Sequence, residues 1–482
     1  MNKITPIKGF LITHAEKKSV SFHMPGHKGQ AFYRRFGYGG FLDNIMDCDI
    51  TEITGADNLF QAEGIIKRSE EVYSRLYDSK KSYLLINGTS GGIIAAILAS
   101  VPKGKKLIMA RNSHKSIFNA LTLADIQPIY AYPETIKEYG ISGAISPDEI
   151  DALLSENYDA EAVILPSPNY YGICSDIEII AEIVHKHNKV LIVDQAHGAH
   201  LKMFSKFGVG GFPKSAEESG ADIVINSIHK TLGSFTQSAV LNINSKRVSK
   251  DIIEDKLQCI ESTSPSYLLM ASLDINGGIL IDHGHQLMKE WTDNLNLFYQ
   301  EAKKIKGLEY IDKISGFDWT KLNFGFGGMG ISGGELEKLL IERNIYIELY
   351  TGNMLMCMTG IGNTRKDIES LIAALKEISS GAGNVVSKAE TNHFENKYQS
   401  SFQRKPIFEI PKFKVWVPLL EAEGRVCASS IIPYPPGIPL VCPGEKFEEE
   451  TLIYIKNLRN NMQKVIGINE TGEVLVGTDE NF

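Results

Sequence analysis

A lysine directly after a short apolar run is the first residue in this chain that could do chemistry. Lys230 stands in the segment NSIHKTLG (226–233), which follows the apolar residues 222–226. Ligands of open parallel sheets gather beyond the carboxyl ends of the strands. A lysine amine held there can form a Schiff base with a carbonyl compound when burial or a nearby charge lowers its pKa. Ser227 and His229 could donate hydrogen bonds to a phosphate. Taken alone, the segment fits an ordinary surface lysine in a turn better.

An aspartate at the end of another apolar run strengthens the hypothesis. Asp194 lies in VDQAHGAH (193–200), one strand–helix unit before Lys230. A buried carboxylate at that place could keep a pyridine nitrogen protonated, which makes the ring an electron sink. The alternative is that Asp194 caps a helix. His197 could face the same pocket, although His197 and His200 could equally be structural histidines.

The segment NGTSGG (87–92) resembles an anion cradle. It lies between the apolar run 82–86 and an apolar helical stretch, so backbone N–H groups at a helix start could meet a phosphate, assisted by the hydroxyls of Thr89 and Ser90. It lacks the residues of a P-loop and the glycine spacing of a dinucleotide fold, and a plain glycine-rich turn remains the alternative. His114, after the next apolar run, could stack on an aromatic ring or be a simple loop residue.

Together these elements fit one phosphate-bearing aromatic aldehyde, pyridoxal 5′-phosphate (PLP). The elements that must position them follow from the pattern of the chain. Short apolar, β-branched runs alternate with helical patterns, which predicts an α/β fold with a mostly parallel sheet. The seven predicted strands are 82–86, 106–110, 128–132, 162–165, 190–193, 222–226 and 239–243. Helices are predicted at 91–100, 176–187 and 274–306.

The domain organisation is predicted from shifts in composition. Residues 1–60 form an N-terminal arm, 61–300 a large PLP-binding domain, 301–380 a small α/β domain, 381–397 a polar linker and 398–482 a C-terminal domain. A helix is predicted to start after Asn363 or Thr364, either of which can cap it.

Composition excludes several classes of function. The 482 residues carry a net charge of −8, which argues against nucleic acid as a partner. The six cysteines form no CxxC pair, so neither a disulfide framework nor a zinc site is expected. The N-terminus has no apolar segment of a signal peptide, and no stretch approaches a membrane span. We therefore expect a soluble, cytoplasmic protein with no membrane partner.

Several ordered motifs resemble the Orn/Lys/Arg decarboxylase family of fold-type-I PLP enzymes, in the short form without an N-terminal response-regulator-like wing domain. Besides the segments above, they are HMPGHKG (23–29), DITEITGADNL (49–59), ARNSHKS (110–116), PSPNYYG (166–172), STSPSY (262–267) and PYPPGIPLVCPGE (433–445). The resemblance covers nearly the whole chain and implies an aspartate-aminotransferase-like fold.

The resemblance also implies roles for the candidate residues. Lys230 would carry PLP, Asp194 would partner its pyridine nitrogen, and His114 would stack on its ring. The implied phosphate contacts are Thr89, Ser90, Ser227 and His229. Ser262 matches a place where the family brings a hydroxyl to the phosphate from the neighbouring subunit, which implies a homodimer or a higher homo-oligomer. His197 stands where the longer members carry a tryptophan, so contacts to the cofactor's hydroxyl group are open.

The implied reaction is decarboxylation of a basic amino acid, with arginine favoured and lysine or ornithine as alternatives. Lys230 or His229 would protonate Cα. Glu445, at the end of its motif, is the candidate partner of the substrate's distal cation, and a solvated surface glutamate is the alternative. An aminotransferase or aldolase would use the same lysine and aspartate; an aminotransferase usually adds an arginine, for which Arg365 is the nearest but disfavoured candidate. A non-catalytic PLP-binding regulator would need a degraded pocket, and no element is missing.

Overall fold

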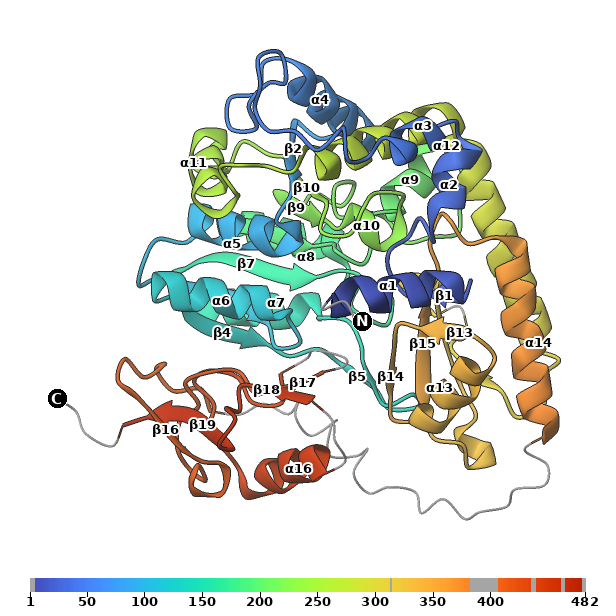
Figure 1. The fold of residues 1–482 in the computed structure, drawn as a ribbon. Coiled ribbons are helices and arrows are strands. Elements are labelled where there is room, and N and C mark those ends of the chain that lie inside the picture. Colours follow the sequence, from blue (N-terminus) through green and yellow to red (C-terminus); the bar gives the residue numbers. More distant parts are fainter. Residues whose placement is uncertain (1–4, 313, 382–405, 435–438, 461–463, 479–482) are drawn as a thin grey trace.

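A seven-stranded sheet forms the centre of the computed structural model, which describes residues 5–312, 314–381, 406–434, 439–460 and 464–478 (Figure 1). The strand order is β2-β10-β9-β8-β7-β3-β4. All neighbouring pairs are parallel except the two that β10 makes with β2 and β9. The strands are β2 (Lys81–Leu85), β3 (Lys106–Ala110), β4 (Gln127–Ala131), β7 (Ala160–Pro166), β8 (Val190–Asp194), β9 (Ile223–Asn226) and β10 (Ala239–Ile243). The predicted α/β class and mostly parallel seven-stranded sheet are confirmed.

Helices cover both faces of this sheet, which explains why its strands are apolar at nearly every position. In β3, Leu107 and Met109 belong to one core, whereas Ile108 and Ala110 belong to the core on the other face. The first core includes side chains of α5 (Gly88–Ser100), α6 (Lys115–Ala124) and α11 (Lys250–Ile260). The second includes side chains of α7 (Pro147–Glu156) and α8 (Ile177–Lys186).

Two long helices flank the segment that follows the large sheet in the chain. Helix α12 (Tyr267–Ala302) starts seven residues earlier than predicted, because the Ser266 hydroxyl caps it by accepting from the N–H of Leu269 at 3.4 Å. Helix α14 (Arg365–Gly381) starts where the sequence predicts. There the Asp367 carboxylate accepts from the N–H of Thr364 at 2.8 Å, and the Thr364 hydroxyl accepts from the N–H of Asp367 at 3.4 Å. The two helices pack side by side (Figure 1).

The segment between these helices contains a four-stranded antiparallel sheet, ordered β11-β12-β15-β14, with helix α13 (Gly333–Glu342) against it. Its strands are β11 (Glu309–Tyr310), β12 (Lys321–Gly325), β14 (Leu349–Thr351) and β15 (Met354–Met358). The N-terminal elements are α1 (Pro6–Glu16), β1 (Val20–Phe22), α2 (Gln30–Arg35) and α3 (Gly39–Asp43). Strand β1 pairs in parallel with β13 (Ile345–Ile347) in a separate two-stranded sheet, so the N-terminal segment is attached to the segment that contains the four-stranded sheet.

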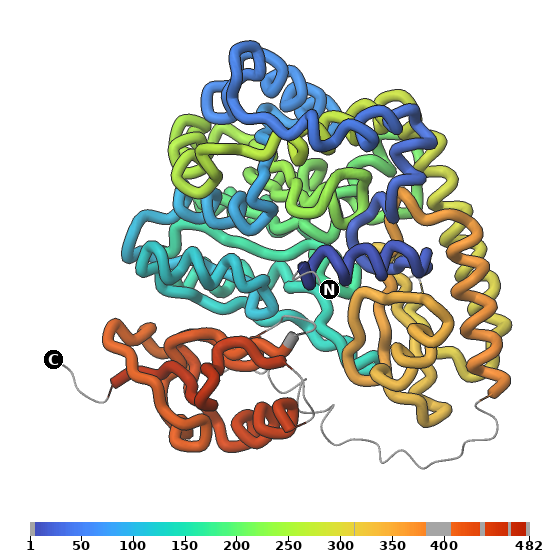
Figure 2. The backbone as a smooth tube through the Cα atoms, viewed as in Figure 1, coloured from blue at the N-terminus to red at the C-terminus, as the bar shows by residue number. Residues whose placement is uncertain are grey.

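The C-terminal segment packs beneath the edge of the large sheet, as the path of the chain in Figure 2 shows. It contains β16 (Lys414–Pro418), β17 (Ile432–Tyr434), α16 (Glu449–Asn460), β18 (Lys464–Ile466) and β19 (Glu473–Gly477), with an apolar core of its own. The Tyr130 hydroxyl of edge strand β4 donates to the carbonyl of Pro443 at 2.8 Å. Apart from the end of α14, the predicted linker 381–397 lies outside the described residues. None of the described helices is both long and apolar enough to cross a membrane.

Further elements complete the large-sheet region. They are α4 (Ile65–Tyr77), the hairpin strands β5 (Thr135–Ile136) and β6 (Ile141–Ser142), α9 (Leu201–Lys206) and α10 (Ile228–Thr231). Helix α10 follows β9 after a single residue, and α9 follows the turn that leaves β8. These two connections and α10 contain several of the predicted site residues.

Candidate active site

A cavity of about 260 Å³ opens at the carboxyl ends of the parallel strands. Eight of the ten predicted site residues line it: Thr89, Ser90, His114, Asp194, His197, Ser227, His229 and Lys230. They come from four connections, each of which leaves a strand of the large sheet. Because parallel strands end at the same edge, residues up to 141 positions apart in sequence meet in one pocket.

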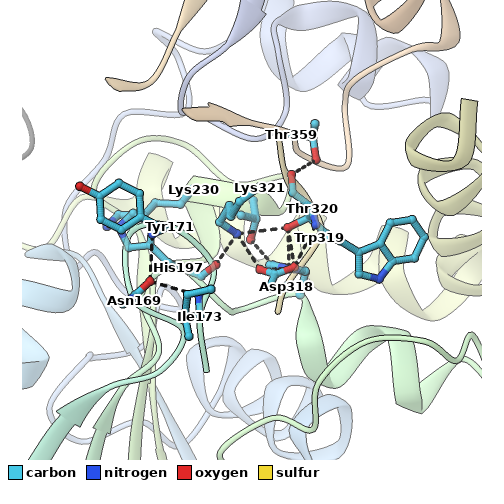
Figure 3. Close-up of polar contacts among 12 residues, drawn as sticks. Asn169, Tyr171, Ile173, His197, Lys230, Asp318, Trp319, Thr320, Lys321 and Thr359 are labelled. Atoms are coloured by element: carbon cyan, nitrogen blue, oxygen red, sulfur yellow. Dashed lines mark hydrogen bonds and ion pairs between the residues drawn. The ribbon is translucent and has the colours of Figure 1, made fainter. Parts of the chain in front are cut away.

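Lys230 lies on α10 with its amine against a histidine. Its Nζ is 2.9 Å from His197 Nε2 (Figure 3). Burial lowers the pKa of Lys230, while the charges of Asp194 and Glu348 act in the opposite direction. Burial, together with the charge of Lys230, holds the pKa of His197 well below its ordinary value, so this imidazole is uncharged at neutral pH. Lys230 is therefore a shielded amine of increased nucleophilicity rather than a surface lysine.

Asp194 ends strand β8 and faces the same cavity. Its Oδ1 accepts from the N–H of Ala196 at 3.1 Å, so it stabilises the local turn and also presents a carboxyl group to the pocket. Burial raises the pKa of Asp194, and the charge of Lys230 and the Ala196 N–H partly oppose that rise. A positively charged partner in the cavity would favour the ionised form of this carboxyl group further.

The start of helix α5 provides free hydrogen-bond donors. The side chain of the N-cap residue Asn87 makes no capping hydrogen bond, and Gly88 adopts φ +67°, a left-handed conformation that favours glycine. Residues 87–90 line the cavity, with the Thr89 hydroxyl 3.1 Å from the Ser227 hydroxyl. An uncapped helix N-terminus with adjacent hydroxyls is suited to a phosphate group.

Three histidines complete the wall. His114 caps α6 by accepting from the N–H of Ser116 at 3.3 Å, and burial together with the charge of Lys230 lowers its pKa to about 3. His229 Nδ1 lies 2.9 Å from the carbonyl oxygen of Ser238, and burial lowers its pKa to about 4. His197 Nδ1 is buried and has no hydrogen-bonding partner in the described part of the chain. A buried polar atom without a partner at a cavity wall is a place where a ligand can bind.

These features fit PLP. The uncapped start of α5 suits its phosphate, Asp194 suits its pyridine nitrogen, and Lys230 suits its aldehyde. The unpartnered Nδ1 of His197 provides a hydrogen-bonding group for a further polar substituent of the ring. The chemistry of the side chains, rather than any one motif, supports this assignment.

Ser262 lies outside the cavity of its own chain. Its side chain is exposed, and its hydroxyl accepts from the N–H of Ser264 at 3.1 Å. Arg365 is also exposed and pairs with Glu369 at 2.8 Å, away from the cavity lining. His200 is buried and does not line the cavity; it bonds to Thr231, Thr320 and Asp318, as a structural histidine would.

The structure gives Glu445 a different role from the predicted one. Its side chain is fully buried and forms a two-point ion pair with Arg111, with Nε–Oε1 at 2.6 Å and NH2–Oε2 at 2.8 Å. Its Oε2 also accepts from the N–H of Cys442 at 2.9 Å. Glu445 thus attaches the C-terminal segment to the large sheet, and both of its oxygens are engaged. It is neither the exposed glutamate nor the substrate-binding one considered from the sequence.

The site also has residues that no sequence motif singled out. Tyr170, Thr236 and Gln237 line the cavity, and the Tyr170 ring lies 4.8 Å from the ring of His197. Tyr170 belongs to the PSPNYYG segment, so the motif could have indicated it. Glu348, whose charge acts on Lys230, lies in the smaller sheet segment and carries no local signal.

The sequence matches two family descriptions. Residues 5–321 match "Orn/Lys/Arg decarboxylase, major domain" and residues 412–474 match "Orn/Lys/Arg decarboxylase, C-terminal domain". The chain belongs to the Orn/Lys/Arg decarboxylase family. This confirms the predicted family and its enzymatic class, a decarboxylase of basic amino acids.

Individual relatives agree with this assignment. The arginine decarboxylase of Bacillus subtilis is 33% identical over 473 residues, covering 94% of both chains. That of Bacillus anthracis is 30% identical over 94% of this chain and 93% of its own. Among solved structures, the lysine decarboxylase of Francisella novicida superposes with a TM-score of 0.73 at 20% identity, covering 94% of this chain and 78% of its own. A serine palmitoyltransferase of Sphingomonas wittichii superposes at 0.53, with 14% identity, over 69% of this chain and 80% of its own, as expected for a shared fold-type-I architecture.

Proposed function

We propose that this member of the family is a PLP-dependent decarboxylase whose preferred substrate is L-arginine, giving agmatine and CO₂. The observation that carries the PLP assignment is the buried Lys230 amine, which lies 2.9 Å from an uncharged histidine. It shares its cavity with Asp194 and the uncapped start of α5. The choice of arginine is supported by two relatives of at least 30% identity that are named arginine decarboxylase.

Different side chains would contact different parts of PLP. Lys230 would hold the aldehyde carbon of PLP, and Asp194 would keep a proton on the pyridine nitrogen. The phosphate would lie at the start of α5 with the hydroxyls of Thr89, Ser90 and Ser227. His114 would limit movement of the ring. Bound PLP supplies a conjugated ring that accepts the electron pair of the Cα–carboxylate bond.

Lys230 is a better proton donor to Cα than His229. If the uncharged His229 donates from Nδ1 to the Ser238 carbonyl, its Nε2 carries no proton. For the same reason, His229 can donate to a phosphate only when it is protonated, a state that the phosphate charge would favour. Lys230 has no such restriction, because its amine gains and loses protons within the shielded cavity.

We propose Glu348 in place of Glu445 as the partner of the substrate's distal cation. Glu348 lies just after β13, where its Oε2 accepts from the N–H of Met24 at 3.0 Å. Its side chain is partly exposed, and its charge reaches Lys230. A half-buried carboxylate with one side-chain hydrogen bond among the described residues retains acceptor capacity for a guanidinium or ammonium group.

We also propose a homodimer with shared sites. The support is the exposed position of Ser262, two residues after α11 and outside the cavity of its own chain, where a neighbouring subunit could contact it.

The direct test is incubation of the PLP-loaded protein with arginine, lysine and ornithine, with CO₂, amine and keto acid measured separately. Release of CO₂ and agmatine from arginine is expected, and Lys230→Ala should abolish both turnover and the visible absorbance of bound PLP. A keto acid as the main product would favour the aminotransferase alternative. PLP binding without turnover of any of the three would favour a binding protein.

A further inference from the structure

The first residue of β12 is a fully buried lysine. Lys321 and Asp318 are both 0% exposed, and their charged atoms lie 2.8 Å apart (Figure 3). The Lys321 ammonium has three acceptors: Asp318 Oδ2, the backbone carbonyl of His197 at 2.8 Å and Thr320 Oγ1 at 3.2 Å. An ammonium has three hydrogens, so all of them can be satisfied away from water. One of these bonds ends on the backbone of the residue that contacts Lys230.

The Asp318 carboxylate connects to the same region from its other side. His200 Nε2 lies 3.0 Å from Asp318 Oδ2, and His200 Nδ1 lies 3.1 Å from the hydroxyl of Thr231. Thr231 directly follows Lys230 on α10. Burial acts to raise the pKa of Asp318, but its interaction with His200 and the charge of Lys321 outweigh burial and hold that pKa below its ordinary value. The carboxylate is therefore charged, and the ion pair is bonded to both connections that carry the site.

Stability alone does not account for such a pair. Desolvating two charges costs several kcal/mol per ion, and buried ion pairs can often be replaced by apolar side chains without loss of stability. We propose that Lys321, held by Asp318, is a positioning residue that fixes the His197–His200 turn against Lys230. This inference rests on the proposed function, because Lys230 is the residue that would hold PLP.

The charge of Lys321 adds a second effect. Burial is the largest cause of the lowered pKa of Lys230, and the positive charge of Lys321 lowers it further. Asp194 and Glu348 oppose this effect. The charged or titratable groups that act on His197 are Lys230, Lys321, His114 and Asp318. A like charge near an amine favours its uncharged, nucleophilic form.

The experiment compares three variants with the wild-type chain. Lys321→Met removes the charge and the donors but keeps a long apolar side chain. Lys321→Met/Asp318→Asn removes both charges together. The matched control is Asn323→Ala, which removes the 2.9 Å bond to the Tyr171 carbonyl, another buried contact between β12 and the large sheet region.

The first measurement is acetylation of Lys230 by acetic anhydride as a function of pH, followed by peptide mass spectrometry on the full chain without added PLP. Only the uncharged amine reacts, so this measurement does not depend on decarboxylase activity. In Lys321→Met the labelling rate at about pH 8 should fall severalfold, because loss of the nearby positive charge raises the pKa of Lys230. In the double variant it should return toward the wild-type rate, because both charges are lost.

The second measurement is kcat for arginine in the PLP-loaded chains. It should fall about tenfold or more in both Lys321 variants, because the His197 carbonyl has lost its donor, and stay near the wild-type value in Asn323→Ala. Equal effects in Asn323→Ala and in the Lys321 variants would overturn the inference and assign the ion pair to domain attachment. Wild-type labelling and kcat in both Lys321 variants would also overturn it. Absence of CO₂ release by the wild-type chain would instead refute the proposed function.

Discussion

Glu261 is a buried carboxyl group beside the start of helix α5. It directly follows α11, its side chain is 7% exposed, and neither oxygen has a hydrogen-bonding partner of normal geometry among the described residues. A Cβ atom added at Gly91 would lie 3.2 Å from its Oε1. Burial raises the pKa of Glu261 from 4.5 to about 7, and the nearby N–H groups of Ile86 and Asn87 reduce this rise.

The Glu261→Gln variant should therefore be more stable than the wild-type chain at alkaline pH. Between 4.5 and about 7 the folded chain holds a proton that the unfolded chain has released. The free energy of unfolding consequently falls as pH rises through this interval, and the loss is complete above about pH 7. A pKa raised from 4.5 to about 7 corresponds to a cost of about 3 kcal/mol. Glutamine carries no charge, so the variant avoids this cost.

The assay is chemical unfolding of both chains at about pH 5 and about pH 8, with the difference in stability between them compared at the two values. We expect a small difference at the lower pH and up to about 3 kcal/mol in favour of the variant at the higher pH. Glu182→Gln, on the exposed face of α8, is the control and should show no such trend. A difference between Glu261→Gln and the wild-type chain that does not change with pH would refute the argument.

Three further outcomes are expected. Asp194→Asn should retain PLP, which is detected by its visible absorbance. Its kcat should fall by an amount that corresponds to about 3 to 4 kcal/mol of lost transition-state stabilisation. Turnover within a few-fold of wild type would mean that another residue partners the pyridine nitrogen. Mixing inactive Lys230→Ala with inactive Ser262→Trp under subunit exchange should restore activity, because one site of the heterodimer takes both residues from intact chains; no recovery despite proven exchange would remove Ser262 from a shared site. Glu445→Gln should destabilise the chain by about 3 to 5 kcal/mol in thermal unfolding, because it leaves the buried Arg111 charge without its partner. Unchanged stability would show that this ion pair contributes nothing to attachment of the C-terminal segment.

Much of the large sheet and its pocket was predictable from local pattern. Apolar runs bounded by glycine and polar residues locate the seven strands within one or two residues, because both faces of this sheet are buried. Once the strands are known to be mostly parallel, the residues that follow them must gather at one edge. That rule alone predicts that Lys230, Asp194 and residues 87–90 lie close together, although none of their segments taken singly was specific for a PLP site.

What the sequence by itself determined is therefore the identity and gathering of the residues that follow the parallel strands. Tertiary structure decided the rest, because those contacts join segments far apart in the chain. Glu445 forms its ion pair with Arg111, which lies 334 positions earlier, and no sequence pattern around either residue predicts this contact. Lys321 reaches the carbonyl of His197, 124 positions away, from a separate sheet. The burial that shifts the pKa values of Lys230 and Glu261 likewise exists only when the helices and both sheets have packed.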